Sequence, residues 1–280
     1  MLSHQTKPIS TYQSARAFWD ARADMWLSYA RDPTSYYFQR TGWVVQLICR
    51  HVEVGRVLDM GCGVGLLVRR LSARGFDAYG ADISPIMVEA AIQEARDGLP
   101  DVAQRFRTGD DTDIPFAGPF DVVTAIGLFP YVAQFERLVR KIRDILRPGG
   151  VVVASCVNRF SLYNGTQLAR YLNPCVTVRN RQRILANLFQ TGLWSAGLID
   201  KAERQQCYSA AAFDALLRRS GFEVIDAMDL YSVLPATLDG DPLQRSAGGR
   251  FVARRFGWSH IGVYRDRRVR VGERNLKDRR

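Results

Sequence analysis

The sequence predicts an α/β fold in which a mainly parallel sheet carries helices on both faces. From Arg56 onward, short apolar runs alternate with segments of helical periodicity, a pattern typical of such sheets. The first apolar run leads into a glycine-rich turn, and the second ends on an acidic residue, Asp82. Ligands of these sheets bind outside the carboxyl ends of the strands, so both features are expected to lie beside a ligand.

The expected elements follow from apolar pattern, capping residues and breakers. Strands are predicted at Arg56–Met60, Ala78–Asp82, Arg105–Gly109, Phe120–Ile126, Val151–Ser155 and Phe222–Ala227, with a last strand inside residues 251–264. Helices are predicted at Leu66–Ala73, Pro85–Ala95 and Phe135–Leu146, and Ser209 is expected to cap a further short helix that ends at Gly221.

Two segments outside this alternation are expected to cover the site. Residues 12–51 are rich in aromatic side chains at helical spacing and predict one or two amphipathic helices, broken at Asp32-Pro33. About 50 residues after Asn158 show little strand pattern, and loops of that length are usually functional or disordered. We therefore expect an N-terminal helical lid segment (1–52), a main domain (53–266) with a lid-like insert at about residues 158–208, and a basic tail (267–280).

The composition excludes several classes of protein. No apolar run approaches the roughly 20 residues of a membrane helix, and the first residues lack the pattern of a signal peptide, so a cytoplasmic location is expected. The five cysteines are scattered and form no Cys-x-x-Cys pair, and there are only three histidines. A disulfide framework and a metal site are therefore not expected.

The formal net charge of +11 leaves a nucleic-acid partner open. Residues 265–280 alone carry eight Lys or Arg against three Asp or Glu. This tail has no aromatic residues interleaved for base stacking, so we interpret it as a solvated end of the chain. An RNA-binding arm is the alternative interpretation.

The strongest motif is a turn with three alternate glycines, Asp59-Met60-Gly61-Cys62-Gly63-Val64-Gly65. Glycines allow a tight turn and a close approach of a ligand, and the helix that follows offers free N–H groups. The third glycine comes one position too early for a dinucleotide fingerprint, and Leu66 occupies the place of the dinucleotide glycine. Asp59 would oppose a pyrophosphate, but it suits a cationic ligand.

Asp82 lies 21 residues after Gly61, a distance at which an acid accepts hydrogen bonds from a ribose diol. The alternative is that it caps a helix ahead of Ser84-Pro85.

Together with four further segments, these motifs resemble the class I S-adenosylmethionine-dependent methyltransferases of the small-molecule type, which include ubiquinone-biosynthesis-like and natural-product enzymes. The resemblance extends over residues 40–228 and implies a Rossmann-like sheet of seven strands, the last antiparallel, with S-adenosylmethionine as cofactor. The further segments are Gly109–Phe116, Phe120–Val123 with the following Gly127–Val132, Leu146–Gly150, and Tyr208–Phe222.

The resemblance also implies roles for individual residues. Asp110 matches the carboxylate that receives the adenine amino group, with Asp111 beside it. Arg40 stands where many relatives place an arginine that reaches the methionine carboxylate; a solvent-exposed arginine is the alternative. The residues expected to bind the cofactor are Arg40, Asp59, Gly61, Gly63, Gly65, Asp82, Ile83, Met87, Asp110, Asp111 and Ile126.

No residue identifies itself as a catalytic base. In methyl transfer the protein mainly aligns the nucleophile with the methyl group and removes water, but an oxygen nucleophile also needs a proton acceptor. Tyr131 and His260 are weak candidates, with an aromatic pocket wall and an internally satisfied histidine as the alternatives. No metal is expected, because Asp110 and Asp111 lack a third ligand.

The predicted function is methyl transfer to an oxygen or nitrogen of a small-molecule acceptor of natural-product, sugar or isoprenoid type. The alternatives are an RNA methyltransferase and a non-methylating protein that retains the cofactor-binding fold. The acceptor pocket is expected between the N-terminal aromatic segment, Leu128–Val132 and the insert from Asn158 to Gln206. Those segments lie where the cofactor's methyl group must point, toward the carboxyl ends of the fourth and fifth strands.

Overall fold

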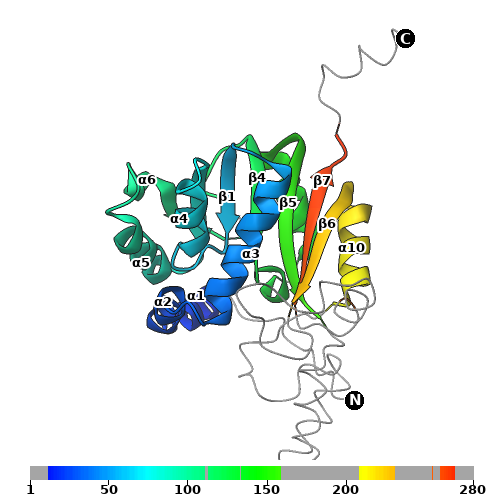
Figure 1. Ribbon diagram of the computed structural model, residues 1–280. Helices are drawn as coiled ribbons and strands as arrows, with labels where there is room; N and C mark the ends of the chain where they lie inside the picture. The colour runs from blue at the N-terminus through cyan, green and yellow to red at the C-terminus, as the bar shows by residue number, and fades with distance from the viewer. Residues whose placement is uncertain are drawn as a thin grey trace, which may run out of the picture.

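The computed structural model describes residues 12–110, 113–132, 134–158, 208–230, 254 and 259–268. Asp111, almost all of the insert and the tail beyond residue 268 lie outside the described residues, and so do the predictions made for them. The described strands form a seven-stranded sheet of order β3-β2-β1-β4-β5-β7-β6 (Figure 1).

The strands of the sheet run in one direction except for β7, which lies between β5 and β6. β1, β2, β3, β4 and β5 run parallel, and β7 lies antiparallel to both β5 and β6. The sheet of seven strands with an antiparallel last strand is therefore confirmed. The strands are β1 (Arg56–Met60), β2 (Asp77–Asp82), β3 (Phe106–Thr108), β4 (Phe120–Ala125), β5 (Leu146–Val157), β6 (Phe222–Leu230) and β7 (Ser259–Asp266).

Serine caps set the starts of three helices. The side chains of Ser35, Ser84 and Ser209 accept hydrogen bonds from the backbone three residues onward, which begins α3, α5 and α10. The helices are α1 (Tyr12–Asp20), α2 (Ala23–Arg31), α3 (Tyr36–His51), α4 (Leu66–Ser72), α5 (Pro85–Ala95), α6 (Val102–Arg105), α7 (Phe135–Ile145) and α10 (Ala210–Arg219), with a 3-10 turn η1 at Phe129–Tyr131.

The N-terminal segment contains three helices, where the sequence predicts one or two. The expected break at Asp32-Pro33 separates α2 from α3, and Asp32 stabilises it by accepting a hydrogen bond from the Thr34 backbone. A second break separates α1 from α2 without a proline or glycine. This break brings Trp19 and Trp26 into one apolar cluster. Its position therefore follows from tertiary packing, and the local sequence does not indicate it.

Alternation along the strands builds a core on each face of the sheet. Val57 and Val122 pack with side chains of α3 and α4, whereas their neighbours Leu58 and Val123 pack with α7 and α10. All four are fully buried, and such burial stabilises the fold by roughly 1.5–3 kcal/mol per side chain. The double-sided core holds the strand ends at fixed positions.

The strand order reverses between β1 and β4, which opens a crevice at the carboxyl ends of the parallel strands. Figure 1 shows α1 and α2 beyond this edge, at the end toward which β1 points. In the described part of the chain, no helix is both long and apolar enough to cross a membrane.

Several predicted strands differ from the structure by one to three residues at an end, and two strands differ by more. β5 begins at Leu146, because Leu146 pairs with Phe120 before the register shifts to Val151 opposite Val122. The segment expected as a turn is thus an irregularity within a longer strand. β7 begins at Ser259 and ends at Asp266, later than the expected residues 251–264.

A buried charged cluster joins α10 to β6 and β7. The two ring nitrogens of His260 lie 2.7 Å from a carboxylate oxygen of Asp229 and 3.0 Å from one of Asp214. Asp214 also accepts hydrogen bonds from the Tyr264 hydroxyl, at 2.8 Å, and from Arg254. Because both partners of His260 are carboxylates, its ring is best satisfied when both nitrogens are protonated.

The pKa values of this cluster show how strongly its members interact. Burial alone would lower the pKa of His260, but hydrogen bonds to Asp214 and Asp229 raise it above 6.5. Burial alone would raise the pKa of Asp214, but hydrogen bonds from His260, Tyr264 and Arg254 lower it from 3.8 to about 2.

We expect Asp214→Ala to lower the free energy of unfolding by about 3 kcal/mol, because it removes one of the two carboxylates that pair with buried His260 and leaves the Tyr264 hydroxyl without its acceptor. The stability that His260 contributes is fully present below pH 6.5 and is lost as the pH rises through its raised folded pKa. The stability that Asp214 contributes is present above pH 3.8 and is lost as the pH falls through about 2. Denaturant titrations at several pH values measure both effects.

Asp144→Asn is the matched control, because Asp144 is exposed on α7 and such a change alters stability by about 0.5 kcal/mol at most. Equal destabilisation by the two substitutions would contradict the role of the cluster.

Candidate active site

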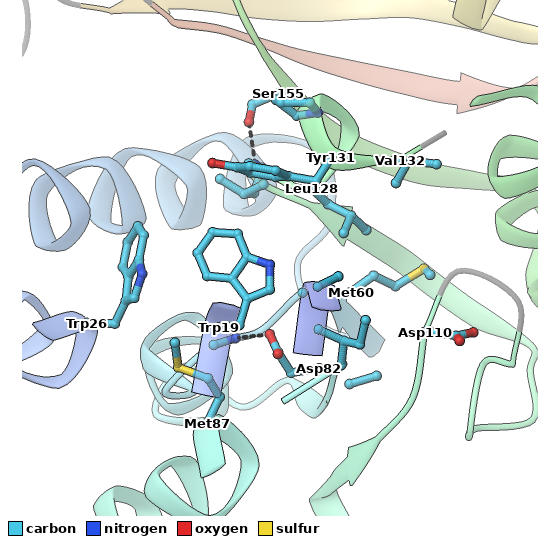
Figure 2. A pocket seen from close by; sticks show the side chains of 18 of the residues that line it. Trp19, Trp26, Met60, Asp82, Met87, Asp110, Leu128, Tyr131, Val132 and Ser155 are labelled. Carbon is cyan, nitrogen blue, oxygen red and sulfur yellow. Dashed lines mark hydrogen bonds between the residues drawn. The ribbon is translucent and has the colours of Figure 1, made fainter. Parts of the chain in front are cut away.

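A cavity of about 880 Å³ opens at the carboxyl edge of the sheet. Its walls come from the turn after β1, the ends of β2 and β5, the loops after β3 and β4, the start of β7, and helices α1, α2 and α3. Figure 2 shows side chains from these elements converging on it. The volume is that of a site for a small molecule or cofactor.

The glycine-rich turn presents its backbone to this cavity. Gly61 and Gly63 have φ angles of 74° and 53°, which favour glycine. A Cβ atom on Gly63 would meet only the Tyr37 hydroxyl, at 3.8 Å, so the space above it is open to a ligand. Gly65 serves another purpose: a Cβ there would lie 2.8 Å from Phe106 and 2.9 Å from Ala91, and Gly65 does not line the cavity.

Asp82 lies at the floor of the cavity with both carboxylate oxygens engaged. One oxygen accepts from the Gly63 N–H at 2.8 Å, the contact drawn in Figure 2, and the other from the Ser84 N–H at 2.9 Å. Burial raises the pKa of Asp82, and these two donors oppose the rise. Ser84, and not Asp82, caps α5. The remaining acceptor positions of the carboxylate are available to a ligand.

Asp59 lies behind the turn and not on the main cavity. Its Oδ1 accepts from the Thr124 hydroxyl at 2.6 Å, and 4% of the residue is exposed. Burial raises the pKa of Asp59 to about 7, Asp82 adds to the rise, and Thr124 and Arg40 oppose it. Asp59 lines a second cavity of about 20 Å³ with Arg40 and Gly61, which is room for about one water molecule.

Arg40 lines both cavities from α3. Its guanidinium lies 5.3 Å from the ring centroid of Tyr36 and 5.8 Å from that of Tyr37. Its Nε is buried and has no hydrogen-bond partner in the described part of the chain. Arg40 is half-buried, so the interpretation as a solvent-exposed arginine does not describe it. A buried donor of this kind is stabilised by an anionic or water partner.

Asp110 follows β3 and lines the cavity. Its Oδ1 accepts from the Asp113 N–H at 2.7 Å, which closes the loop after β3. Asp111 lies outside the described residues. The apolar lining beside these carboxylates includes the predicted residues Ile83, Met87 and Ile126.

An aromatic wall faces the carboxylates. Trp19 of α1 contacts Tyr131 of η1 edge to face, with ring centroids 5.0 Å apart, and Trp26 lies 6.3 Å from Trp19. Figure 2 shows Trp19 between Tyr131 and Asp82 in that view. The N-terminal segment and the loop after β4 thus line one cavity, as the acceptor-pocket hypothesis requires; the insert lies outside the described residues.

His260 does not line the cavity, although its neighbour Ser259 does. Its ring is fully buried against Asp214 and Asp229, so its position matches that of an internally satisfied histidine. Among the described residues no group of three or more His, Cys, Asp or Glu side chains could hold a metal ion.

Several lining residues were not identified from the sequence. They come from the end of β5, the start of β7 and the start of α7, and no motif marks them. These residues are Ser155, Cys156, Ser259, Gln134 and Arg137. Ser155, Cys156 and Ser259 come together only because β7 pairs with β5, which places Ser259 opposite Val157. This pairing joins segments far apart in the sequence, so no local pattern indicates it. For Gln134 and Arg137 the only signal is their place directly after the loop that follows β4.

A model of the methyltransferase domain family matches residues 35–227. The ubiquinone biosynthesis O-methyltransferase of Mesorhizobium japonicum is 34% identical over 134 residues, which are 48% of this chain and 51% of that protein. The match thus spans 51% and 62% of the length of the first two curated relatives.

Solved structures share the fold. The magnesium protoporphyrin IX methyltransferase of Synechocystis PCC 6803 with bound S-adenosylhomocysteine has a TM-score of 0.59 at 18% identity, covering 91% of this chain and 100% of that one. The 4+2 cyclase SpnF has a TM-score of 0.58 at 19% identity, covering 92% and 98%. At these identities the likeness concerns the fold alone.

We expect Asp82→Ala to weaken binding of S-adenosylhomocysteine by more than about tenfold, because a charge-assisted contact contributes roughly 1.5–3 kcal/mol. The substitution also leaves the Gly63 and Ser84 N–H groups without their acceptor. Isothermal titration calorimetry measures the change. Glu89→Ala on the exposed side of α5 is the control and should leave the affinity unchanged. Binding of NAD with no response to S-adenosylhomocysteine would refute this assignment of the site.

We also expect ligand binding to release a proton from Asp59 near pH 7. A ligand ammonium group beside Asp59 favours the ionised carboxylate, so affinity should rise as the pH increases through about 7 and level off above it. Calorimetry in buffers of different ionisation enthalpy counts the released protons. Asp59→Asn should abolish the release; an unchanged release in that variant would contradict the prediction.

Proposed function

The chain belongs to the methyltransferase domain family, and on this basis we propose that it transfers a methyl group from S-adenosylmethionine to an oxygen or nitrogen atom of a small-molecule acceptor. The matched residues 35–227 include the glycine-rich turn, Asp82, Asp110 and the loop after β4. One observation carries the proposal: a single cavity joins a polar side that suits an amino-acid nucleoside to an aromatic side that suits a second, apolar molecule.

The polar side fits S-adenosylmethionine. The open space above Gly63 admits a ligand against the backbone, and the unpartnered Nε of Arg40 suits a carboxylate. Asp59 and Asp82 are buried acids that suit an ammonium group and a ribose diol. We therefore propose that Arg40, Asp59, Gly61, Gly63 and Asp82 hold the amino-acid and ribose parts.

The rest of the cofactor would lie along the loop after β3. Asp110 would accept from the adenine amino group, while Ile83, Met87 and Ile126 supply apolar contacts. When bound, the cofactor supplies an electrophilic methyl group on a sulfonium.

The aromatic side of the cavity positions the acceptor and excludes water. Trp19 and Tyr131 contact each other edge to face in the lining of the cavity. The Ser84 hydroxyl donates to Asp20 at 2.5 Å, which ties the end of α1 to the start of α5. This holds the aromatic wall of α1 over the site. A dry, aligned site is the main requirement for displacement at a methyl group.

Tyr131 is the remaining candidate for a proton acceptor, and we propose that it forms the pocket wall. Its ring packs edge to face against Trp19, which is how a wall residue is held. With Tyr131 in that role, the acceptor must present a nucleophile that is neutral and basic, such as an amine, or one that ionises readily, such as an acidic phenol.

We expect Tyr131→Phe to keep methyl transfer within about threefold of the unsubstituted protein, whereas Tyr131→Ala raises the KM for the acceptor by about tenfold or more through lost packing. Transfer from methyl-labelled S-adenosylmethionine to a panel of hydroxy- and amino-aromatic acceptors measures both. A Phe variant that binds S-adenosylhomocysteine normally but loses transfer by about 100-fold would identify Tyr131 as the base instead.

A further inference from the structure

We propose that Arg137 binds an anionic group of the acceptor, so that the acceptor is an apolar or aromatic molecule bearing a carboxylate. The inference rests on the proposed function, because it concerns the acceptor half of the same cavity. It begins with the charged residues of the lining, which are Arg40, Asp82, Asp110 and Arg137.

Three of these four charged residues lie on the polar side of the cavity, where we propose that the cofactor binds. Arg40 and Asp82 lie around the glycine-rich turn, and Asp110 lies at the end of β3, where the cofactor is placed. Arg137 comes from the first turn of α7, after the loop that follows β4. It therefore belongs to the acceptor half, where the described lining contains no carboxylate.

Within the described part of the chain, the charge of Arg137 has no anionic partner. Its one hydrogen bond runs from Nη1 to the side-chain oxygen of Gln134, at 3.4 Å. Gln134 lines the cavity too. By contrast, Arg143 on the same helix pairs with the buried Asp266 at 3.1 Å. Among the described residues, therefore, none neutralises the charge of Arg137, and this charge suits an anionic ligand.

The surroundings of Arg137 define the rest of the acceptor. The lining that follows β4 and β5 includes the apolar residues Leu128, Pro130, Val132 and Val157. Arg137 itself is exposed, so it lies at the rim of the cavity. An acceptor with an apolar body inside and an acid at one end satisfies both parts of this surface.

A guanidinium suits this role because it binds a carboxylate through two parallel hydrogen bonds. The anchored acid would fix the orientation of the acceptor, with the atom that receives the methyl group deeper in the cavity. Lysine can supply the charge but not the paired geometry. A lysine in place of Arg137 should therefore keep only part of the effect.

The test compares acids with their neutral amides. The probes are 4-hydroxybenzoate, 4-hydroxycinnamate and indole-3-acetate, each beside its primary amide, added to the full chain saturated with S-adenosylhomocysteine. We expect at least one acid to bind about tenfold more tightly than its amide by calorimetry. Arg137→Gln should abolish this preference and Arg137→Lys should retain part of it.

Arg140→Gln is the matched control. Arg140 is exposed on the same helix but does not line the cavity, so the preference for acids should survive its loss. An equal effect of the two glutamine substitutions would indicate a general surface charge and overturn the inference. Acids that bind no more tightly than their amides, or not at all, would overturn it as well.

These outcomes are separable from failure of the proposed function. If neutral phenols or amines accept the labelled methyl group while acids show no advantage, the function stands and the role of Arg137 falls. If the protein does not bind S-adenosylmethionine, the proposed function itself fails.

Discussion

The carboxylate of Asp82 is the contact on which the geometry of the cavity depends. It accepts from the Gly63 N–H in the turn and from the Ser84 N–H ahead of α5. The Ser84 hydroxyl in turn donates to Asp20 at the end of α1. One side chain at the end of β2 therefore fixes the turn after β1 and the start of α5, and through Ser84 it links both to α1. The cofactor side of the cavity and its aromatic wall are therefore positioned by the same series of hydrogen bonds.

This arrangement carries an electrostatic strain that a cation can relieve. Asp59 and Asp82 are both buried, and each occupies an environment that raises its carboxyl pKa. Arg40 opposes this rise at Asp59, yet its own Nε has no partner in the described residues. A ligand that brings both an ammonium group and a carboxylate can complement the acids and the arginine together. Two buried acids beside an arginine suit a zwitterionic amino-acid ligand better than a polyanionic dinucleotide.

The parts of the site that could be predicted from sequence are those built from consecutive residues. The limits of β1 and α5 agree with the structure because each has a local signal: an apolar run before glycines for the first, and a serine cap followed by proline for the second. Asp82 was identified by its distance along one βαβ unit. Gly65 shows the limit of this reasoning, because the same motif contains a glycine that serves packing against Phe106.

The remaining features depend on contacts between segments far apart in the chain. The break between α1 and α2 follows from packing of Trp19 and Trp26 in one cluster. The burial of His260 follows from the position of β7 between β5 and β6, which places its ring between Asp214 and Asp229. No local pattern distinguishes such a histidine from one in an active site, since both are histidines near a strand terminus.

The two halves of the cavity consequently differ in how they are held. Most of the polar half is attached to β1, β2 and β3 inside a double-sided core, and Arg40 joins it from α3. The acceptor half combines α1, η1 and the first turn of α7, which contact one another mainly through side chains such as Trp19 and Tyr131. Substitutions there change the shape and charge of the wall without altering strand pairing. The fold alone does not fix the acceptor, and the proposed role of Arg137 therefore rests on the charge and lining of this half of the cavity.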